Sequence, residues 1–199
     1  MNALFVGIAG GTASGKSTTS LALARALGAE CLLVFHDRYY RSVPDGNTQA
    51  FNFDHPDSLD TETLVADLGR LRAGLPTRMP VYDFSHHTRA PEAEWELVEP
   101  RPIVIVEGIL VLAEPALRDA FDFKVFVHAP ADVRLARRIR RDMAERGRSV
   151  ESVLDQYERT VRPMHDQFIE PSRHMADLIV DGCSPTESMV AAVRGLIAR

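Results

Sequence analysis

The sequence predicts an α/β fold in which helices cover both faces of a mainly parallel central sheet. Three observations predict it: short apolar runs recur along the 199 residues, segments with helical periodicity separate most of these runs, and a glycine-rich turn follows the first run. Continuous apolar runs suit strands that are buried on both faces, as the strands of a parallel sheet are. Strands that alternate with helices indicate an arrangement in three layers.

Five apolar runs are the expected strands of the central sheet. They are Leu4 to Ala9, Cys31 to Phe35, Ile103 to Val106, Phe123 to Val127 and Leu178 to Val180. The helix after the first strand is expected from about Lys16 to Leu27, because Gly28 is a natural residue at the end of a helix. A second apolar stripe at helical spacing runs from Leu64 to Leu71 and is closed by Gly74.

The segment from about 76 to 100 departs from this pattern. Arg78 to Phe84 and Trp95 to Val98 resemble short strands around a polar, histidine-rich loop, so we expect a small β-rich insertion. The chain contains no internal repeat, low-complexity tract or linker, and its length suits one hydrophobic core. We therefore expect residues 1–199 to form a single domain.

The composition limits the class of partner. The 23 Lys and Arg residues against 28 Asp and Glu residues give a net charge of -5, which argues against nucleic acid or an anionic membrane as a partner. Cys31 and Cys183 stand in neither a CxxC motif nor a metal-ligand spacing, which favours the reducing cytoplasm. Because the net negative charge does not attract anions, any phosphate must be bound by a local group of residues.

A phosphate-binding loop follows the first expected strand. Residues 10–17 read Gly-Gly-Thr-Ala-Ser-Gly-Lys-Ser and match the pattern GxxxxGK[ST] between a strand and a helix. Glycines let the backbone approach phosphate oxygens, and the helix N-terminus adds partial positive charge. Lys16 is expected to reach the β- and γ-phosphates, and the Ser17 hydroxyl to bind Mg²⁺. The expected phosphate contacts are Gly10, Gly11, Thr12, Ala13, Ser14, Gly15, Lys16, Ser17 and Thr18. An ordinary glycine-rich turn is the alternative.

Two carboxylates follow other expected strands, at the edge where open α/β sheets bind ligands. Glu107 comes directly after Val106 and is a candidate for Mg²⁺ positioning. Asp37 follows the second strand and could accept the proton of an attacking hydroxyl, or bind Mg²⁺ as well. The alternatives are a solvated carboxylate and an Asx turn. No NKxD sequence is present, which disfavours a GTPase switch.

Two segments combine aromatic rings with polar groups. Phe51 to Pro56 places Asp54 among aromatic side chains, and Tyr82 to His87 adds rings and hydrogen-bonding groups. Aromatic faces beside a carboxylate and an imidazole suit a ribose and a planar base. For any one of these residues taken singly, the alternative is core packing or an exposed histidine.

The segment 132–148 is rich in arginine and is expected to be a helix that closes over the site as a lid. On a helix, three arginines share one face and three apolar residues lie roughly opposite: Arg134, Arg138 and Arg141 against Leu135, Ile139 and Met143. In a protein of net negative charge, a cationic face favours an anionic partner such as a triphosphate. A solvated charged face is the alternative.

With these motifs in place, the chain resembles the uridine kinase, or uridine-cytidine kinase, family over nearly its whole length. The matching stretches are GIAGGTASGKST, HDRYY, FNFDHPDSLD, PVYDFSHHTR, VEGIL, DVRLARRIRRDMAERGRS and QYERTVRPMHDQFIEPSRHMAD. The resemblance implies a P-loop NTPase fold and Mg²⁺-dependent phosphoryl transfer from ATP, or GTP, to the 5′-hydroxyl of uridine or cytidine, in pyrimidine salvage. It also implies a cytoplasmic homotetramer.

The resemblance implies a role for individual residues. Asp37 resembles the catalytic base, Lys16 the phosphate-binding lysine, and Ser17, Glu107 and Asp37 the metal site. The implied nucleoside contacts are Asp54, Tyr82, Phe84, His87, Arg138, Arg148 and Gln156. The implied phosphate contacts of the lid are Arg141 and Arg146.

The sequence departs from the family pattern at three places. Arg38 stands where family members commonly have a small residue, His128 to Pro130 replaces a more acidic stretch, and the loop from Asp181 to Pro185 lacks an Asp near the donor base. His87 resembles members that accept both uridine and cytidine. Two rival functions stay open: a small P-loop kinase for another alcohol, such as phosphoribulokinase or pantothenate kinase, and a regulatory module that binds ATP without turnover.

Overall fold

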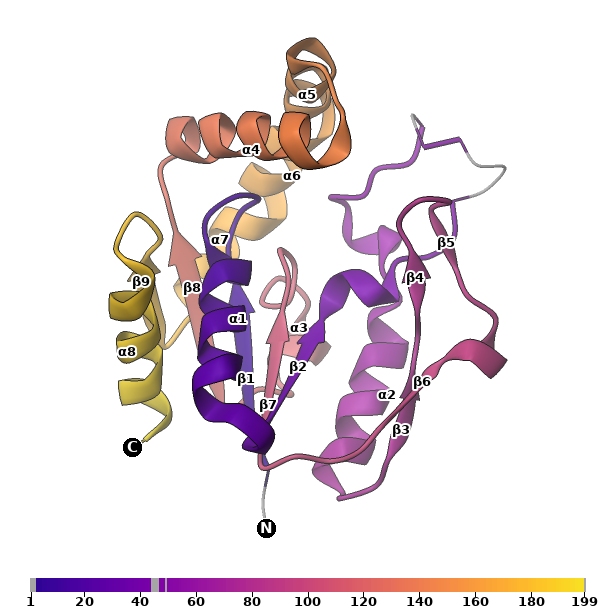
Figure 1. Ribbon diagram of the computed structural model, residues 1–199, viewed down its shortest axis with the longest axis vertical. Coiled ribbons are helices and arrows are strands. Elements are labelled where there is room, and N and C mark those ends of the chain that lie inside the picture. The colour runs from indigo at the N-terminus through magenta and orange to yellow at the C-terminus, as the bar shows by residue number, and fades with distance from the viewer. Residues whose placement is uncertain (1–2, 44–46, 49, 199) are drawn as a thin grey trace.

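The computed structural model describes residues 3–43, 47–48 and 50–198. Five parallel strands form the central sheet in the order β2-β7-β1-β8-β9 (Figure 1). Their bounds are Leu4–Ala9 for β1, Cys31–Phe35 for β2, Ile103–Glu107 for β7, Phe123–His128 for β8 and Leu178–Asp181 for β9. The predicted parallel sheet is confirmed, and each predicted strand boundary lies within one residue of the observed one.

Helices cover both faces of this sheet. The four helices that flank it are α1 (Lys16–Leu27), α2 (Thr61–Arg72), α3 (Pro115–Arg118) and α8 (Thr186–Ile197). Successive side chains of a strand point to opposite faces, so Val6 and Ile8 of β1 pack in the core beside α1 and α8. Phe5 packs in the second core, beside α2 and α3. Burial on both faces explains why the strands are continuous apolar runs.

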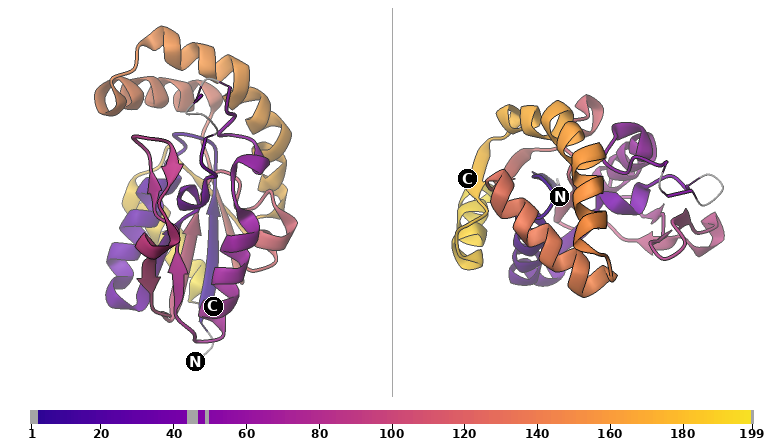
Figure 2. Two further views of the ribbon diagram at one scale, coloured as in Figure 1. Left: turned by 90° about the vertical axis from the view of Figure 1, so that its right-hand side faces the viewer. Right: turned by 90° about the horizontal axis from the view of Figure 1, so that it is seen from above.

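A run of helical segments after β8 crosses the carboxyl end of the sheet (Figures 1 and 2). Its α-helices are α4 (Ala131–Arg146), α5 (Val150–Gln156), α6 (Arg162–Met164) and α7 (Glu170–Ser172). Wide π-helical turns at Tyr157–Val161 and His165–Ile169 join the last three. Pro163 and Pro171 follow these turns. Proline has no N–H and its ring clashes with the carbonyl four residues earlier, so it interrupts the regular α-helical ladder at these points.

Two small antiparallel sheets lie between α2 and β7. In one, β3 (Thr77–Met79) pairs with β6 (Glu96–Val98), and in the other, β4 (Tyr82–Asp83) pairs with β5 (Thr88–Arg89). The prediction of one strand from Arg78 to Phe84 was wrong, because the chain divides at Pro80, which has no N–H for a strand ladder. Arg38 connects this region to the main sheet: its Nε donates to the Pro80 carbonyl at 2.9 Å, and its Nη2 lies 2.7 Å from Glu96 Oε2.

Short 3₁₀ turns connect several of these elements. They are Gly28–Glu30, His36–Tyr39, Pro56–Ser58, Glu92–Glu94 and Arg173–Met175. The turn after β2 carries Asp37, so it places that carboxylate at the carboxyl end of the sheet. Within residues 3–43, 47–48 and 50–198, no helix has the length and hydropathy that a bilayer crossing requires.

Candidate active site

The loop between β1 and α1 has the wrapped backbone that a phosphate-binding loop needs. Gly10 and Gly15 have φ angles of 153° and 104°, and Ala13 has a φ angle of 58°. A Cβ atom on Gly10 would lie 2.4 Å from the carbonyl oxygen of Val127, so β8 packs directly against the loop. Because the N-cap residue of α1 is Gly15, which has no side chain, the N–H groups of the first turn are left for an anion.

Lys16, Ser17 and Glu107 meet at the start of α1. Lys16 Nζ lies 3.8 Å from Glu107 Oε1 and 3.4 Å from Ser17 Oγ. The register of the sheet places Glu107 beside Ile8 of β1 and Phe35 of β2, and only 3% of it is exposed. Its Oε2 atom has no hydrogen-bond partner among the described residues. A buried carboxylate oxygen and a hydroxyl that both lie within 4 Å of the same lysine nitrogen fit Mg²⁺, a hard cation that prefers oxygen ligands.

Asp37 lies within electrostatic range of the P-loop lysine and of Glu107. Burial raises the pKa of Asp37, the charge of Lys16 opposes this rise, and the Glu107 carboxylate adds to it. Arg146 of α4 lowers the same pKa and Asp54 raises it. A carboxylate with a raised pKa accepts a proton more readily than an ordinary aspartate, which suits a general base. Asp37 therefore lies within electrostatic range of four other candidate site residues.

Asp54 is a second buried carboxylate, with 6% of its surface exposed. Thr160, in the first π-helical turn, donates a hydrogen bond from its hydroxyl to Asp54 Oδ2 at 3.4 Å. Burial raises the pKa of Asp54, while Arg138 and the Thr160 hydroxyl oppose the rise. Because a carboxylate can accept several hydrogen bonds, Asp54 has acceptor capacity left for the adjacent hydroxyls of a sugar.

A chain of aromatic rings joins two of the segments that the sequence singled out. The ring centroid of Tyr40 lies 5.4 Å from that of Phe53 and 5.6 Å from that of Tyr82. Phe53 also lies 5.3 Å from the His87 ring, and Tyr82 lies 5.0 Å from Phe84. Tyr82 is buried, whereas 58% of Phe84 is exposed, so the chain of rings reaches the surface at Phe84.

Two polar atoms in this aromatic cluster have no hydrogen-bond partner in the part of the chain that the structure describes. They are the Tyr82 hydroxyl and His87 Nδ1. His87 also has a φ angle of 50°, a backbone conformation that residues with a Cβ atom seldom adopt. Buried polar atoms without partners beside aromatic faces fit a planar ligand that carries donors and acceptors of its own.

The side chains of Arg138 and Arg148 meet on the amide of Gln156. Arg138 Nη2 donates to Gln156 Oε1 at 2.8 Å, and Arg148 Nη1 donates to the same oxygen. Arg138 Nη1 also donates to Thr12 Oγ1 at 3.1 Å, which ties α4 to the P-loop. The structure thus brings three of the expected nucleoside contacts together beside the phosphate-binding loop.

The faces of α4 differ in part from the sequence-based expectation. Arg134 and Arg138 share a face as predicted, but together with Asp142 they are the buried residues of the helix. Met143, on the expected apolar face, is 48% exposed. The helix crosses the polar P-loop and not the hydrophobic core, so its buried side is the charged one (Figure 1).

One contact beside the P-loop had no signal in the sequence. Arg134 Nη2 lies 3.0 Å from His165 Nε2, and a Cβ atom on Gly11 would meet both side chains. Burial and the charge of Arg134 together lower the pKa of His165 to about 4, against the opposing charge of Glu170. The imidazole is therefore neutral near pH 7 and can accept the guanidinium hydrogen bond. The two residues are 31 positions apart, so no local sequence motif predicts that they pair.

The loop after β9 packs against the P-loop. A Cβ atom on Gly182 would lie 2.0 Å from the carbonyl oxygen of Ser14. The N–H of Gly182 donates to the His128 carbonyl at 2.7 Å, and its own carbonyl accepts from Arg137 Nη1 at 2.9 Å. The loop that starts after Asp181 is therefore fixed to both the P-loop and α4.

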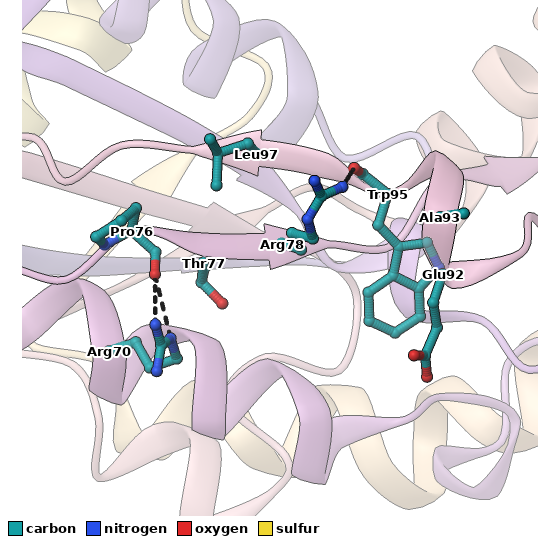
Figure 3. A pocket seen from close by; sticks show the side chains of 8 residues that line it. All are labelled: Arg70, Pro76, Thr77, Arg78, Glu92, Ala93, Trp95 and Leu97. Atoms are coloured by element: carbon teal, nitrogen blue, oxygen red, sulfur yellow. Dashed lines mark hydrogen bonds between the residues drawn. The ribbon is translucent and has the colours of Figure 1, made fainter.

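A surface groove of about 770 Å³ lies away from this site, along the β3–β6 sheet (Figure 3). Its lining residues are Arg70, Pro76, Thr77, Arg78, Glu92, Ala93, Trp95 and Leu97. Arg70 Nη2 donates to the Pro76 carbonyl at 2.8 Å, and Arg78 Nη1 donates to the Trp95 carbonyl at 3.1 Å. None of the candidate site residues lines this groove.

Comparison with known proteins agrees with this geometry. A family model described as the phosphoribulokinase / uridine kinase family matches residues 5–188. The uridine kinase of Chloroflexus aggregans is 48% identical over 185 residues, which cover 91% of this chain and 88% of that protein.

Solved structures share the fold. That of a possible uridine kinase from Bacillus stearothermophilus has a TM-score of 0.68 at 19% identity and covers 91% of this chain and 90% of that one. Phosphoribulokinase from Rhodobacter spheroides has a TM-score of 0.67 at 17% identity and covers 93% of this chain and 74% of that one. The fold class is thus confirmed as that of the P-loop kinases, and the chain belongs to the phosphoribulokinase / uridine kinase family.

Proposed function

We propose that this protein phosphorylates the 5′-hydroxyl of uridine and of cytidine with MgATP, giving UMP and CMP. The observation that carries the proposal is the presence of two carboxylates, the half-buried Asp37 in electrostatic range of Lys16 and the buried Asp54, together with a chain of aromatic rings. A kinase for a ribonucleoside needs one carboxylate for the attacking hydroxyl and a second group for the sugar. The relatives named uridine kinase support this choice of acceptor.

The donor half of the site consists of the P-loop and the lid. Residues 10–18 supply backbone N–H groups and Lys16 supplies a positive charge for the β- and γ-phosphates. Arg141 and Arg146 of α4 supply further charge as the phosphoryl group moves. Ser17, Glu107 and Asp37 would hold Mg²⁺, which neutralises phosphate charge when bound.

Asp37 performs the proton transfer. The 5′-oxygen of the nucleoside forms a bond to the γ-phosphorus as the bond from that phosphorus to the bridging oxygen breaks, and ADP leaves. The proton of the 5′-hydroxyl passes to the Asp37 carboxylate, whose raised pKa favours its acceptance. Phosphoryl transfer needs little more from the protein than this positioning and charge stabilisation.

The acceptor half of the site binds the sugar and the base of the nucleoside. Asp54 accepts hydrogen bonds from the two ribose hydroxyls, and Tyr82, Phe84 and His87 surround the base. The Tyr82 hydroxyl and His87 Nδ1, which have no hydrogen-bond partner among the residues that the structure describes, are available for the polar edge of a pyrimidine. Arg138, Arg148 and Gln156 complete the contacts from the lid side. A cytoplasmic setting and a homotetramer stay predictions of the family resemblance.

The first experiment measures ADP formation with MgATP and a panel of acceptors. Uridine, cytidine, deoxyuridine, pantothenate and ribulose 5-phosphate separate the proposal from its rivals, and GTP in place of ATP tests the donor. Turnover confined to the ribonucleosides supports the proposal and the role of Asp54. Turnover with ribulose 5-phosphate or pantothenate alone would contradict the acceptor assignment, and ATP binding without turnover on any acceptor would favour a regulatory module.

A further inference from the structure

Asp142 lies on the buried face of α4 and has no exposed surface. Four guanidinium groups surround its carboxylate. The shortest nitrogen–oxygen distances are 3.6 Å from Arg138, 2.8 Å from Arg141, 3.5 Å from Arg146 and 3.6 Å from Arg148. Charged side chains are rarely buried unless they are paired, and here one carboxylate is paired four times.

The four arginines belong to both halves of the proposed site. Arg138 and Arg148 share the Gln156 oxygen on the acceptor side. Arg141 and Arg146 are the proposed phosphate contacts on the donor side. Asp142 is thus a side chain through which the two sets of arginines are connected.

The backbone of Asp142 also shapes this cluster. Its carbonyl oxygen accepts the N–H of Gly147, which ends α4 with a φ angle of 61°, and the N–H of Arg148 at 3.1 Å. The chain turns back at this point, so Arg148 returns to the carboxylate that Arg138 and Arg141 already contact. The side chain and the main chain of one residue therefore fix the end of the helix and the arginines around it.

The charges explain why this arrangement is suited to a triphosphate. Four guanidinium groups around one carboxylate leave an excess of three positive charges, so the arginines repel one another. Among the described residues, only Arg141 donates a hydrogen bond to the carboxylate, and the other three guanidinium groups are held at ion-pair distance. Each guanidinium has five N–H donors and therefore keeps donors for other partners. Arg141 and Arg146 stay partly exposed, at 31% and 55% of their side chains, so their remaining donors can reach a ligand.

We propose that Asp142 is a positioning residue that holds the lid arginines of both the donor and the acceptor half in their binding geometry, an inference that rests on the proposed function. It touches neither substrate. It acts through the guanidinium groups, so its loss should weaken both halves of the site at once. A residue that served only one half would change the KM of one substrate.

The test is D142N, which removes the charge and keeps the size of the side chain. We expect kcat/KM to fall for both MgATP and uridine by about 100-fold, the order of loss that a misplacement of about 1 Å in catalytic groups produces. Glu145, exposed on the same helix, supplies the matched control E145Q, which makes the same change in net charge and should leave both values as in the wild type. Wild-type kinetics in D142N would overturn the proposal.

A double-mutant cycle separates positioning from general stability. Asp142 contacts Arg146 as one of four arginines, so D142N should reduce kcat/KM for MgATP by a smaller factor in the background of R146A than in the wild type. Multiplicative losses, measured well below the melting temperature of each variant, would contradict a positioning role through Arg146 on the donor side. Should D142N not fold, D142E keeps the charge but moves it. The proposal then expects a folded protein with reduced kcat/KM for both substrates, and wild-type values would contradict it.

The outcome for Asp142 can be separated from that of the proposed function. Binding of a non-hydrolysable MgATP analogue, followed calorimetrically, needs no acceptor. If uridine and cytidine fail as substrates of the wild type, the acceptor assignment is wrong, whereas weaker binding of the analogue to D142N than to E145Q still supports the positioning role. Equal binding by both variants would contradict that role on the donor side.

Discussion

The substitution D37N separates the contribution of the Asp37 carboxylate to catalysis from its effect on the stability of the fold. The substitution D37N keeps the size of the side chain and removes both its negative charge and its ability to take up a proton. General-base catalysis typically contributes about 10²–10⁴-fold, so kcat with uridine should fall by that factor. Affinity for MgATP should change little, because Lys16, the P-loop backbone and the two other proposed Mg²⁺ ligands, Ser17 and Glu107, remain.

The same substitution should stabilise the protein. Burial is the largest cause of the raised pKa of Asp37, and Glu107 and Asp54 add to it, so the charged form is disfavoured in the fold. A group whose pKa is raised by folding stabilises the fold most below its unfolded pKa, and this contribution is lost as the pH rises through the folded pKa. At neutral pH the neutral amide avoids this cost. Because Asp37 is half-buried and the charges of Lys16 and Arg146 offset part of the cost, we expect a gain at the low end of the range for an unpaired polar group, about 1 kcal/mol. For a domain of this size, that is roughly 2–4 °C in Tm.

Calorimetry of ligand-free protein at several pH values, beside the coupled assay of ADP formation, measures both effects. The difference in Tm between D37N and the wild type should be largest near pH 7. It should shrink on acidification, because wild-type Asp37 then becomes neutral as well. The control D119N changes an exposed carboxylate and should alter neither quantity. Retention of wild-type kcat would refute the base assignment, and a Tm that falls in D37N would refute the electrostatic argument.

Three further predictions concern the same site. Burial raises the pKa values of Asp37 and Asp54, and both carboxyl groups must be ionised to act. The acidic limb of the pH profile of kcat/KM for uridine should therefore lie above the ordinary pKa range of aspartate. An acidic limb at or below that range would contradict the proposed roles. D54N should raise the KM for uridine by roughly 10-fold or more, since a hydrogen bond to a charged group contributes about 1.5–3 kcal/mol, and should leave the KM for MgATP unchanged in steady-state kinetics. G182A should lower Tm, because the new Cβ would lie 2.0 Å from the Ser14 carbonyl oxygen and overpacking costs about 1–3 kcal/mol. Thermal unfolding measures this change. An unchanged Tm would mean that the loop after β9 is not tightly packed against the P-loop.

The part of the site that could be predicted from the sequence is the part that local geometry determines. The P-loop and the start of α1 are consecutive residues, and the glycines at 10 and 15 take the positive φ angles that the motif requires. Glu107 and Asp37 could be placed because parallel strands end at the same edge of a sheet, so a residue that follows an apolar run lies beside the loop.

The remaining features depend on contacts between distant segments. Helical spacing correctly put Arg134 and Arg138 on one face, but it could not show that this face is buried, because the partners that make burial possible lie elsewhere in the chain. The pairing of Arg134 with His165 and the hydrogen bond from Thr160 to Asp54 cross 31 and 106 positions. The division at Pro80 could have been predicted, since proline inside an expected strand argues against that strand.

The polar contact between α4 and the P-loop bears on how the lid can work. Arg138 reaches Thr12 and Arg137 reaches the Gly182 carbonyl by hydrogen bonds that water can replace. The net contribution of such a bond is about 0.5–1.5 kcal/mol, so lifting the helix breaks contacts of modest free energy and exposes little apolar surface. A helix held by an apolar face would have to expose that face each time substrates enter. The charged underside of α4 therefore suits the proposed lid. Arg138 ties the helix to the P-loop by a hydrogen bond that is easily exchanged for water, and the proposed phosphate contacts, Arg141 and Arg146, lie on the same helix.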